Sequence, residues 1–505
     1  MSKKQNKSRL NFPKAPTGIE GLDVITHGGL PRNRPTLLLG NTGCGKTIMG
    51  IEFLVHGITL FDEPGAFISF EEKTNELEVN IGSFAFGTEK FIADGKLYLE
   101  HIAISPGQTT ETGKYNIEGL FVRIAAAIKS VNAKRIVLDS MDSLFNGFDY
   151  KILRSEFKRL LSWLKEKNVT AIITGEAGNA FLTSNGAEEY VADCVILLTN
   201  RVVNQITTRR LRVVKYRGSI HGNNEYPFTI DAKGITVLPQ ISLAVNQLSS
   251  SKRVLSGIGA LDSMLDKKGF YMGSSILISG TAGTGKTSIA ATFASSICDN
   301  KQRCLFCAFE EAPNQVLRNM RSIGIDLRQY EASGHLHFYY ARPTLQNLEL
   351  HFMAIRKTIE EKKPKFIILD PITNLMTEGP NSDIRSMLTR FVDYLKTQQI
   401  TVMFTAAITV GSIERNPSDE GISSMVDTWI MVQDIEVDAK RTRSLCIMKS
   451  RGMPHSNEVQ RFVISKKGIQ ILPLITATNN SQANIKRSAK EHWNLSTSKE
   501  SIGIK

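Results

Sequence analysis

Two stretches of the sequence carry residues whose types and spacing suit the binding of nucleotide phosphates. The pattern G-x-x-x-x-G-K-T occurs at residues 40–47 and again at residues 280–287, each time between a short apolar run and a helix-like segment. In such a loop the backbone N–H groups point at the β-phosphate, the lysine reaches the β- and γ-phosphates, and the threonine hydroxyl binds Mg²⁺. The sequence therefore predicts two sites for ATP with Mg²⁺. Their predicted nucleotide-binding residues are Gly43, Cys44, Gly45, Lys46 and Thr47 in the first loop, and Gly283, Thr284, Gly285, Lys286 and Thr287 in the second.

One aspartate in each half of the chain, Asp139 or Asp370, ends an apolar run that is typical of a buried strand. A carboxylate in this position, beside a phosphate-binding loop, usually holds the Mg²⁺ shell. The alternative is an aspartate that caps a helix or a turn. The predicted metal ligands are Thr47, Asp139, Thr287, Glu310 and Asp370.

Two adjacent glutamates end the strand that precedes each of these aspartates. One carboxylate of each pair would accept a proton from a water or a hydroxyl, while its neighbour lies near the metal. The alternative is an exposed acidic turn, but the recurrence in both halves argues against it. The predicted catalytic residues are Glu71, Glu72, Glu310 and Glu311.

A basic pair comes late in each half, as Lys215-x-Arg217 and Lys449-x-Arg451. Two residues that are two positions apart on a strand share a face of the sheet. Such a pair would supply positive charge to the γ-phosphate held by a neighbouring chain, as in ring-forming ATPases. The alternative is a solvated basic strand.

The chain is a duplication, because five motifs recur in the same order with offsets of 231–239 positions. In each half, near-continuous apolar runs alternate with helix-like stretches, which predicts an α/β fold with a mostly parallel sheet covered by helices on both faces. Ligands of such sheets bind at the carboxyl ends of the strands. The expected strands are residues 36–39, 66–70, 135–138, 170–174 and 194–198, and residues 275–279, 304–309, 366–369, 400–405 and 428–432.

The predicted domains are residues 12–245 and 253–475, joined by a polar, serine-rich linker at residues 246–252. Residues 1–11 are expected to form a basic tail. Residues 476–505 are rich in Asn, Ser, Thr and Lys and are expected to form a flexible tail.

The composition indicates a soluble protein of two large domains. The chain has 505 residues, of which 41% are hydrophobic and 22% are charged. It has no apolar run near the roughly 20 residues that a membrane span needs, and its basic start lacks the apolar segment of a signal peptide. Six scattered cysteines fit a reducing cytosol, so we expect a cytoplasmic protein without membrane contact. Cys304 and Cys307, three positions apart on an expected strand, are interpreted as core residues on opposite faces.

The net charge of +13 gives weak support to a nucleic-acid partner. Residues 1–14 hold five Lys and Arg and no acid, and residues 476–505 hold five Lys and Arg against two Glu. Most of the positive charge therefore lies in the expected tails, where it would simply be solvated.

These motifs, in this order and twice, give the chain a resemblance to the KaiC family of circadian-clock ATPases, and more widely to the RecA-like ATPases. The resemblance covers about residues 12–475 and includes less common marks, namely G-I-x-x-L-D before each loop, F-E-E, and K-x-R-G followed by a histidine. It implies two tandem RecA-like P-loop domains in a double-ringed homo-hexamer with ATP between subunits. It also implies that the glutamate pairs are catalytic and that the Lys-x-Arg pairs contact the neighbouring subunit's nucleotide. Further nucleotide-binding positions that the resemblance implies are Ser83, Tyr216, Ser219, His221, Arg443 and Ser450, beside Lys215, Arg217, Lys449 and Arg451.

The resemblance further implies autophosphorylation, because the family's second domain modifies an adjacent Ser-Thr pair. The matching residues here are Ser423 and Ser424, with serine at the second position. The alternative is that the two serines only cap the structure beside the next strand. The corresponding place in the first domain is 191–193 and lacks the hydroxyl pair, so that domain is expected only to hydrolyse ATP.

The sequence departs from the family pattern at three places. Pro371 follows Asp370 where serine is usual, Ile323 replaces a common aromatic near adenine, and the tail after Ile475 does not match the segment by which clock proteins engage their activator. These departures favour a divergent relative that serves as a signalling or timing switch, with regulatory proteins of the clock or signalling type as partners.

Two other classes of function compete with this interpretation. A RecA-like nucleic-acid-dependent ATPase, of recombinase or helicase type, would require basic loops and often an additional DNA-binding domain, and no such domain is visible in the sequence. A scaffold that uses ATP only to assemble, without kinase activity, would not need the two glutamate pairs.

Overall fold

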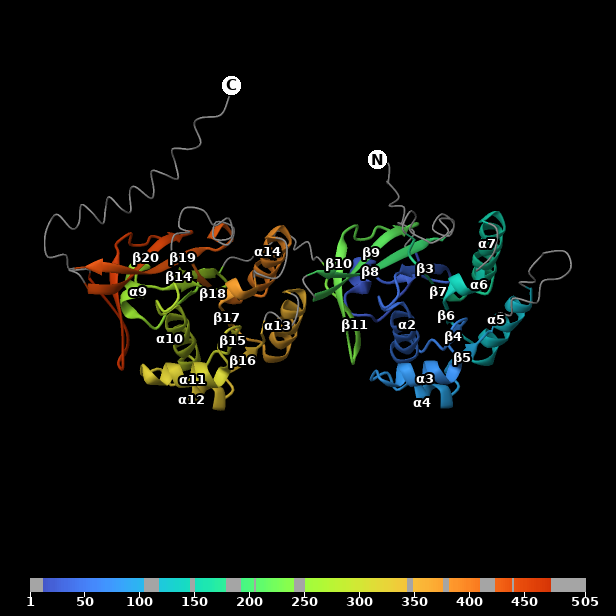
Figure 1. Cartoon of the computed structure of the whole chain (residues 1–505), viewed down its shortest axis with the longest axis horizontal. Helices are drawn as coiled ribbons and strands as arrows, with labels where there is room; N and C mark the ends of the chain where they lie inside the picture. Colours follow the sequence, from blue (N-terminus) through green and yellow to red (C-terminus); the bar gives the residue numbers. More distant parts are fainter. Residues whose placement is uncertain are drawn as a thin grey trace, which may run out of the picture. The chain divides into compact units, whose positions relative to one another are not determined.

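A computed structural model describes most of the chain, which forms two compact units, 1–241 and 242–505. Each unit has its own sheet and helices (Figure 1). The predicted tails, residues 1–11 and 476–505, and residues 246–249 of the predicted linker lie outside the described residues, and the predicted domain boundaries stay a prediction. The described ranges are residues 12–103, 118–145, 150–178, 192–203, 206–239, 250–342, 348–375, 381–408, 423–437 and 440–473.

The first unit is built on a nine-stranded sheet with the order β11-β10-β9-β8-β3-β7-β6-β4-β5. From β5 to β8 every neighbouring pair is parallel, whereas β8 to β11 form an antiparallel extension. The mostly parallel sheet predicted from the sequence is therefore confirmed. The strands are β3 (Pro35–Gly40), β4 (Gly65–Ser69), β5 (Leu97–His101), β6 (Arg135–Asp139), β7 (Thr170–Gly175), β8 (Cys194–Val203), β9 (Ile206–Tyr216), β10 (Glu225–Asp231) and β11 (Gly234–Val237).

Helices cover both faces of this sheet, as Figure 1 shows for α2 on one side and α5 and α7 on the other. Side chains alternate between the faces of a strand, so Leu38 packs with Phe53 of α2, whereas Leu37 packs with Phe121 of α5. Because both faces are buried, the strands are almost continuously apolar. The helices are α1 (Leu22–Ile25), α2 (Lys46–Phe61), α3 (Thr74–Gly82), α4 (Thr88–Ala93), α5 (Glu118–Ser130), α6 (Met141–Phe145) and α7 (Tyr150–Glu166), and a small ribbon pairs β1 (Lys14–Ala15) with β2 (Leu30–Pro31).

The second unit repeats this architecture with the strand order β16-β15-β17-β18-β14-β19-β20-β21-β22. Its strands are β14 (Ser275–Gly280), β15 (Cys304–Ala308), β16 (Leu336–Tyr340), β17 (Phe366–Asp370), β18 (Thr401–Ala407), β19 (Thr428–Val437), β20 (Lys440–Ser450), β21 (Gln460–Ser465) and β22 (Gly468–Pro473), and β12 (Arg253–Val254) pairs with β13 (Phe270–Tyr271). Its helices are α9 (Gly259–Met264), α10 (Lys286–Asp299), α11 (Pro313–Ser322), α12 (Arg328–Ala332), α13 (Leu348–Lys362), the 3₁₀ turn η2 (Ile372–Leu375) and α14 (Asn381–Thr397).

The cysteine pair on β15 confirms the expected alternation. Cys304 lies in the core beneath α10, and Cys307 lies in the core beneath α13 and α14, both with no exposed surface. They are core residues on opposite faces, as the sequence predicts.

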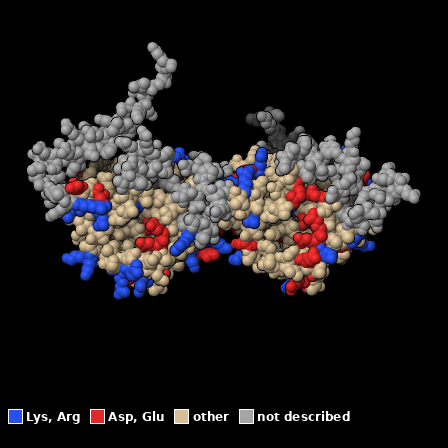
Figure 2. Space-filling view, viewed as in Figure 1, with Lys and Arg blue, Asp and Glu red and all other residues tan. Residues whose placement is uncertain are grey.

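The visible face of the molecule carries acidic side chains in a band on the first unit, whereas Lys and Arg form separate groups on the second unit (Figure 2). The described part of this face shows no continuous basic stripe of the kind that nucleic-acid binding requires. Among the described helices, none is long and apolar enough to cross a membrane.

Candidate nucleotide-binding sites

The first phosphate-binding loop lies between β3 and α2. Gly43 and Gly45 have φ values of 74° and 104°, in the left-handed region that favours glycine. A Cβ on Gly45 would also lie 2.6 Å from the Ile230 side chain. Helix α2 begins at Lys46, so its N-terminus, the end of a helix that attracts anions, faces the loop.

The second loop, between β14 and α10, has the same backbone. Gly283 and Gly285 have φ values of 78° and 97°, and α10 begins at Lys286. Lys286 Nζ donates to the carbonyls of Gly280 at 2.9 Å and Thr281 at 2.8 Å. Burial lowers the pKa of Lys286, and nearby Asp370 and Glu310 oppose this shift. The ammonium is thus held at the loop.

The predicted metal side of each site is a threonine that contacts an aspartate. Thr47 Oγ1 donates to Asp139 Oδ2 at 2.7 Å, and the Thr174 hydroxyl donates to the other carboxylate oxygen. Burial raises the pKa of Asp139, while both hydroxyl bonds oppose that shift. Threonine and carboxylate oxygens are suitable ligands for Mg²⁺, which usually takes few protein ligands and completes its shell with phosphate oxygens and water. Among the described residues, no group of three or more acidic, His or Cys side chains is arranged so that it could hold a metal ion.

The second site repeats this contact around Asp370. The Thr405 hydroxyl donates to Asp370 Oδ1, and Thr287 also bonds to the Asp370 carboxylate. Burial raises the pKa of Asp370, and the same two hydroxyl bonds oppose the shift. The residues present at both sites therefore fit a bound Mg²⁺.

The predicted catalytic glutamates begin the segments after β4 and β15. Glu71 accepts hydrogen bonds from Ser140 Oγ at 2.7 Å and from the Ser143 hydroxyl. Glu72 accepts from Asn80 Nδ2 at 3.3 Å. Ser140 directly follows Asp139, so its bond places the Glu71 carboxylate beside the predicted metal ligand.

The second pair keeps only one of these two arrangements. Glu311 accepts from Asn319 Nδ2 at 3.0 Å, as Glu72 does from Asn80. Pro371 occupies the position of Ser140 and has no hydroxyl to donate to Glu310. The two units therefore differ in the hydrogen bonding of the first glutamate, because Pro371 cannot give Glu310 the bond that Ser140 gives Glu71.

The Lys-x-Arg pairs lie near the amino ends of the parallel strands, whereas the phosphate-binding loops lie at the carboxyl ends. At the amino end of β14, Ile276 pairs with Thr428, and Thr428 pairs with Ser450, which lies between Lys449 and Arg451. The loop begins at Gly280, four residues beyond Ile276 on this strand, so strand geometry separates the two places by about 13 Å. In the first unit, Thr36, Cys194 and Tyr216 pair in the same way.

The second pair contacts the predicted phosphorylation site. Lys449 Nζ donates to the Ser423 carbonyl at 2.7 Å, and Arg451 donates to the Ser424 carbonyl at 2.8 Å. Burial and the neighbouring Arg451 lower the pKa of Lys449. Two cations therefore lie beside the two serines within one chain.

Comparison with known proteins gives the same assignment on both halves. Residues 15–242 and 254–475 match the family model described as "ATPase: KaiC". The chain is 46% identical over 470 residues to the circadian clock protein KaiC2 of Synechocystis sp., covering 92% of this chain and 83% of that protein. It is 35% identical over 473 residues to the circadian clock oscillator protein KaiC of Synechococcus elongatus, covering 93% and 91%.

The chain belongs to the KaiC family. The KaiC match spans both P-loops, so the predicted fold class, two tandem RecA-like domains, is confirmed together with the family. A KaiC-type ATPase binds nucleotide, and the geometry of the two loops agrees with this. The roles of individual site residues stay predictions.

Four of the further nucleotide contacts that the KaiC resemblance implies lie at the ends of two strands. Tyr216 is the last residue of β9 and Ser450 the last of β20, and Ser219 and His221 follow β9. Tyr216 is buried, and its hydroxyl donates to the Gly29 carbonyl at 2.9 Å. Ser450 is buried with its hydroxyl 3.0 Å from that of Thr428. The side chains of both residues therefore support the fold, and a nucleotide contact would fall to their backbone. Ser219 and His221 follow Tyr216, and the His221 ring packs edge-on to the Tyr216 ring with centroids 6.5 Å apart.

Two predicted contacts lie elsewhere in the KaiC-type domains. Ser83 directly follows α3, and its hydroxyl donates to the Asn80 carbonyl at 2.8 Å. Arg443 pairs with Asp434 on β19, six positions before Lys449, beyond the carboxyl end of β14. The structure therefore does not bring Arg443 together with Lys449 and Arg451.

Sequence reasoning missed residues at the end of β7, the strand next to the loop strand. Lys46 Nζ lies 2.7 Å from Glu176 Oε1, and the Glu176 amide donates to Asp142 Oδ2 at 2.5 Å. Thr174, two residues earlier, holds Asp139 through its hydroxyl. The signal that marks this place is a threonine near the end of an apolar run, which recurs as Thr405 in the second half.

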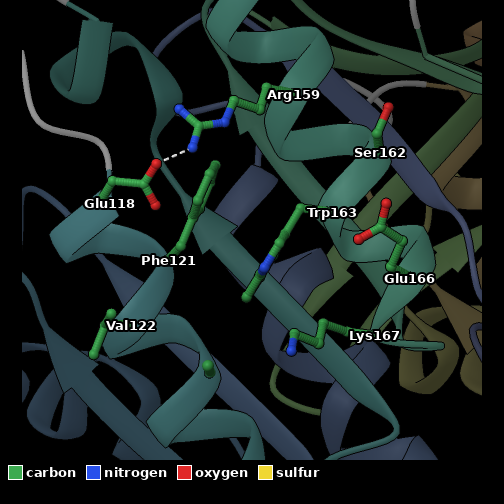
Figure 3. A pocket seen from close by; sticks show the side chains of 9 residues that line it. Glu118, Phe121, Val122, Arg159, Ser162, Trp163, Glu166 and Lys167 are labelled. Carbon is green, nitrogen blue, oxygen red and sulfur yellow. Dashed lines mark hydrogen bonds and ion pairs between the residues drawn. The ribbon is translucent and has the colours of Figure 1, made fainter.

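A groove between α5 and α7 is separate from the KaiC-type sites. Its floor is a stack of Phe121 and Trp163, with ring centroids 5.1 Å apart, and an ion pair of Arg159 with Glu118 lies at its rim (Figure 3). Neither helix carries a predicted nucleotide or metal ligand.

Proposed function

We propose that the protein is a KaiC-type ATPase that assembles as a double-ring homo-hexamer, hydrolyses Mg-ATP mainly in its first unit, and phosphorylates itself on Ser423 and Ser424. It acts as a signalling or timing switch, and regulatory proteins read its phosphorylation state. The KaiC relatives whose names carry a circadian-clock role support the timing element of this proposal.

The observation that carries the proposal is the separation of the serines from their own phosphate-binding loop. Ser423 and Ser424 contact Lys449 and Arg451 near the amino end of β14 in the second sheet, whereas the loop lies at the carboxyl end of that strand. Along β14 the two places are about 13 Å apart. The phosphate donor for these serines is therefore the ATP of a neighbouring chain.

The transfer step uses groups that the second unit supplies. The serine Oγ attacks the γ-phosphorus, the bond between that phosphorus and the β-γ bridging oxygen breaks, and ADP leaves. The serine proton passes to Glu310, because a serine hydroxyl is a weak nucleophile without a base. Mg²⁺, held by Thr287 and Asp370, would neutralise charge on the phosphates.

The first unit is proposed to transfer the phosphoryl group to water. Arg217 N donates to the Asp193 carbonyl at 2.8 Å, and Arg451 N donates to the Asp427 carbonyl at 2.8 Å, so the two aspartates are equivalent. By this equivalence the two serines correspond to positions 189 and 190, just before the residues 191–193 expected from the sequence, and these positions are Glu and Tyr and lie outside the described residues. The first unit thus lacks a serine acceptor, while Glu71 and Glu72 remain to activate water.

Removing either loop lysine should halve nucleotide binding. In Lys46→Ala and in Lys286→Ala we expect bound nucleotide to fall by about half, because each lysine serves one of two phosphate sites. The measurement is the amount of nucleotide that stays with the protein after gel filtration in Mg-ATP. Lys167→Ala, a change at an exposed lysine, is the control, and full occupancy in either loop variant would remove the assignment of that loop.

Assembly should depend on nucleotide, because the Lys-x-Arg pairs can complete a site only on a neighbouring chain. With Mg-ATP, light scattering should give the mass of six chains of 56.0 kDa. Arg217→Ala combined with Arg451→Ala should shift the distribution toward smaller species at equal ATP. A monomer at saturating ATP would contradict the hexamer.

A further inference from the structure

The loop lysines of the two units have different partners. Lys46 Nζ donates to the carbonyls of Gly40 at 2.5 Å and Asn41 at 3.3 Å, and it also lies 2.7 Å from Glu176 Oε1. Lys286 makes the two corresponding carbonyl bonds, to Gly280 and Thr281. The carboxylate partner distinguishes the first loop from the second.

The register shows what replaces this carboxylate in the second unit. Ala177 N donates to the Gly40 carbonyl at 3.4 Å, and Ile408 N donates to the Gly280 carbonyl at 3.0 Å. The residues immediately before them are Glu176 and Ala407, so alanine occupies the position of the acid. The second unit therefore has no side chain at this position that could bind Lys286.

The backbone around Glu176 fixes its carboxylate beside the loop. Its amide donates to Asp142 Oδ2 at 2.5 Å, and Gly175 before it pairs with Leu39 on β3. The Lys46 side chain is 9% exposed and that of Glu176 is 40% exposed. The ion pair thus lies at the mouth of the loop, with the ammonium inside and the carboxylate on the solvent side.

Nucleotide phosphates need the same ammonium. A loop lysine binds the β- and γ-phosphates as a point charge, and a carboxylate 2.7 Å from it competes for that charge and repels the phosphates. We propose that Glu176 is a positioning residue that competes with the nucleotide for the Lys46 ammonium. It thereby weakens the affinity of the first site for nucleoside di- and triphosphates. This inference rests on the proposed nucleotide binding by the first unit.

The test measures the affinity of one site at a time in the full-length chain. In a Lys286→Ala parent, in which only the first loop binds, a fluorescent ADP analogue with Mg²⁺ is titrated against the parent and against Glu176→Gln. We expect Glu176→Gln to bind about 3- to 10-fold more tightly, since a half-exposed ion pair and one repulsive charge are removed. The gain should shrink as salt is added, Glu176→Asp should stay near the parent, and Glu78→Gln, an equal charge change on exposed α3, should leave the affinity unchanged.

The reciprocal change guards against a merely structural effect. In a Lys46→Ala parent, Ala407→Glu should weaken binding of the same analogue at the second loop by a similar factor. Tighter binding when the glutamate is removed from the first unit, together with weaker binding when one is introduced into the second, would not follow from damage to the fold. An unchanged or weaker affinity in Glu176→Gln, in a parent that binds ADP, overturns the inference alone. A folded Lys286→Ala parent that binds no ADP contradicts the proposed first site and the inference together.

Discussion

Replacement of both Glu71 and Glu72 by glutamine should lower the steady-state rate of ATP hydrolysis by about 10²- to 10⁴-fold, the usual effect of losing a positioned general base. Glutamine keeps the shape of glutamate and can still accept the bond that Ser140 Oγ donates to Glu71 at 2.7 Å. It cannot take a proton from water. The rate of phosphate release measures the effect, and nucleotide retention in the variant shows whether the site still binds ATP.

The matched control is the second pair. Glu310→Gln with Glu311→Gln should leave most of the hydrolysis in place, because we assign turnover mainly to the first unit. The Ser140 bond to Glu71 has no counterpart at Pro371, so the two pairs are not equivalent as bases. Unchanged turnover in the first double variant, with loss in the second, would assign hydrolysis to the second unit.

Phosphate transfer between chains should be all-or-none in a mixing experiment. One chain carries Glu310→Gln and keeps its serines, and the other carries Ser423→Ala with Ser424→Ala and keeps its base. We expect neither protein alone to take up label from ATP labelled in the γ-phosphate. Mixed together, the Glu310→Gln chains should gain label, because the donor site lies on the neighbouring chain.

The two chains can be distinguished by a purification tag of different length. Ser263→Ala, at an exposed serine in α9, serves as the control and should label like the wild type. Label on Glu310→Gln protein without its partner would contradict the role of Glu310 as base. Wild-type protein that takes up no label at either serine would leave an ATPase without kinase activity.

Local patterns were enough to predict most of the parallel part of the fold, but not its outer parallel strands β5 and β16. Apolar runs that end in Asp139 and Asp370 become β6 and β17, and the two loops do begin helices at Lys46 and Lys286. These features depend on neighbours in sequence, namely glycines that allow positive φ and strands buried on both faces. The antiparallel strands β9 to β11 were not predicted, because their pairing depends on contacts between distant segments.

In the candidate sites, too, features set by neighbouring residues could be predicted, and features set by distant segments could not. The loop residues and the strand-end aspartates follow from spacing alone. The contact of Lys46 with Glu176 joins residues that are 130 positions apart, and no local pattern encodes it. Similarly, the position of Lys449 and Arg451 beside Ser423 and Ser424 depends on the register of β20 against β19, which the sequence does not reveal.

The burial of the cysteines makes them a chemical probe of local opening. The thiolate is the form of cysteine that attacks a thiol reagent, and burial raises the pKa of Cys304 and Cys307 on β15 far above the ordinary value. Labelling at these two sulfurs therefore requires β15 to separate from its neighbours, whereas Cys446 on β20 is only half-buried. Because Cys44 and Cys194 belong to the first unit, the rate at which the reagent modifies each sulfur would report how often each unit opens, without any introduced cysteine.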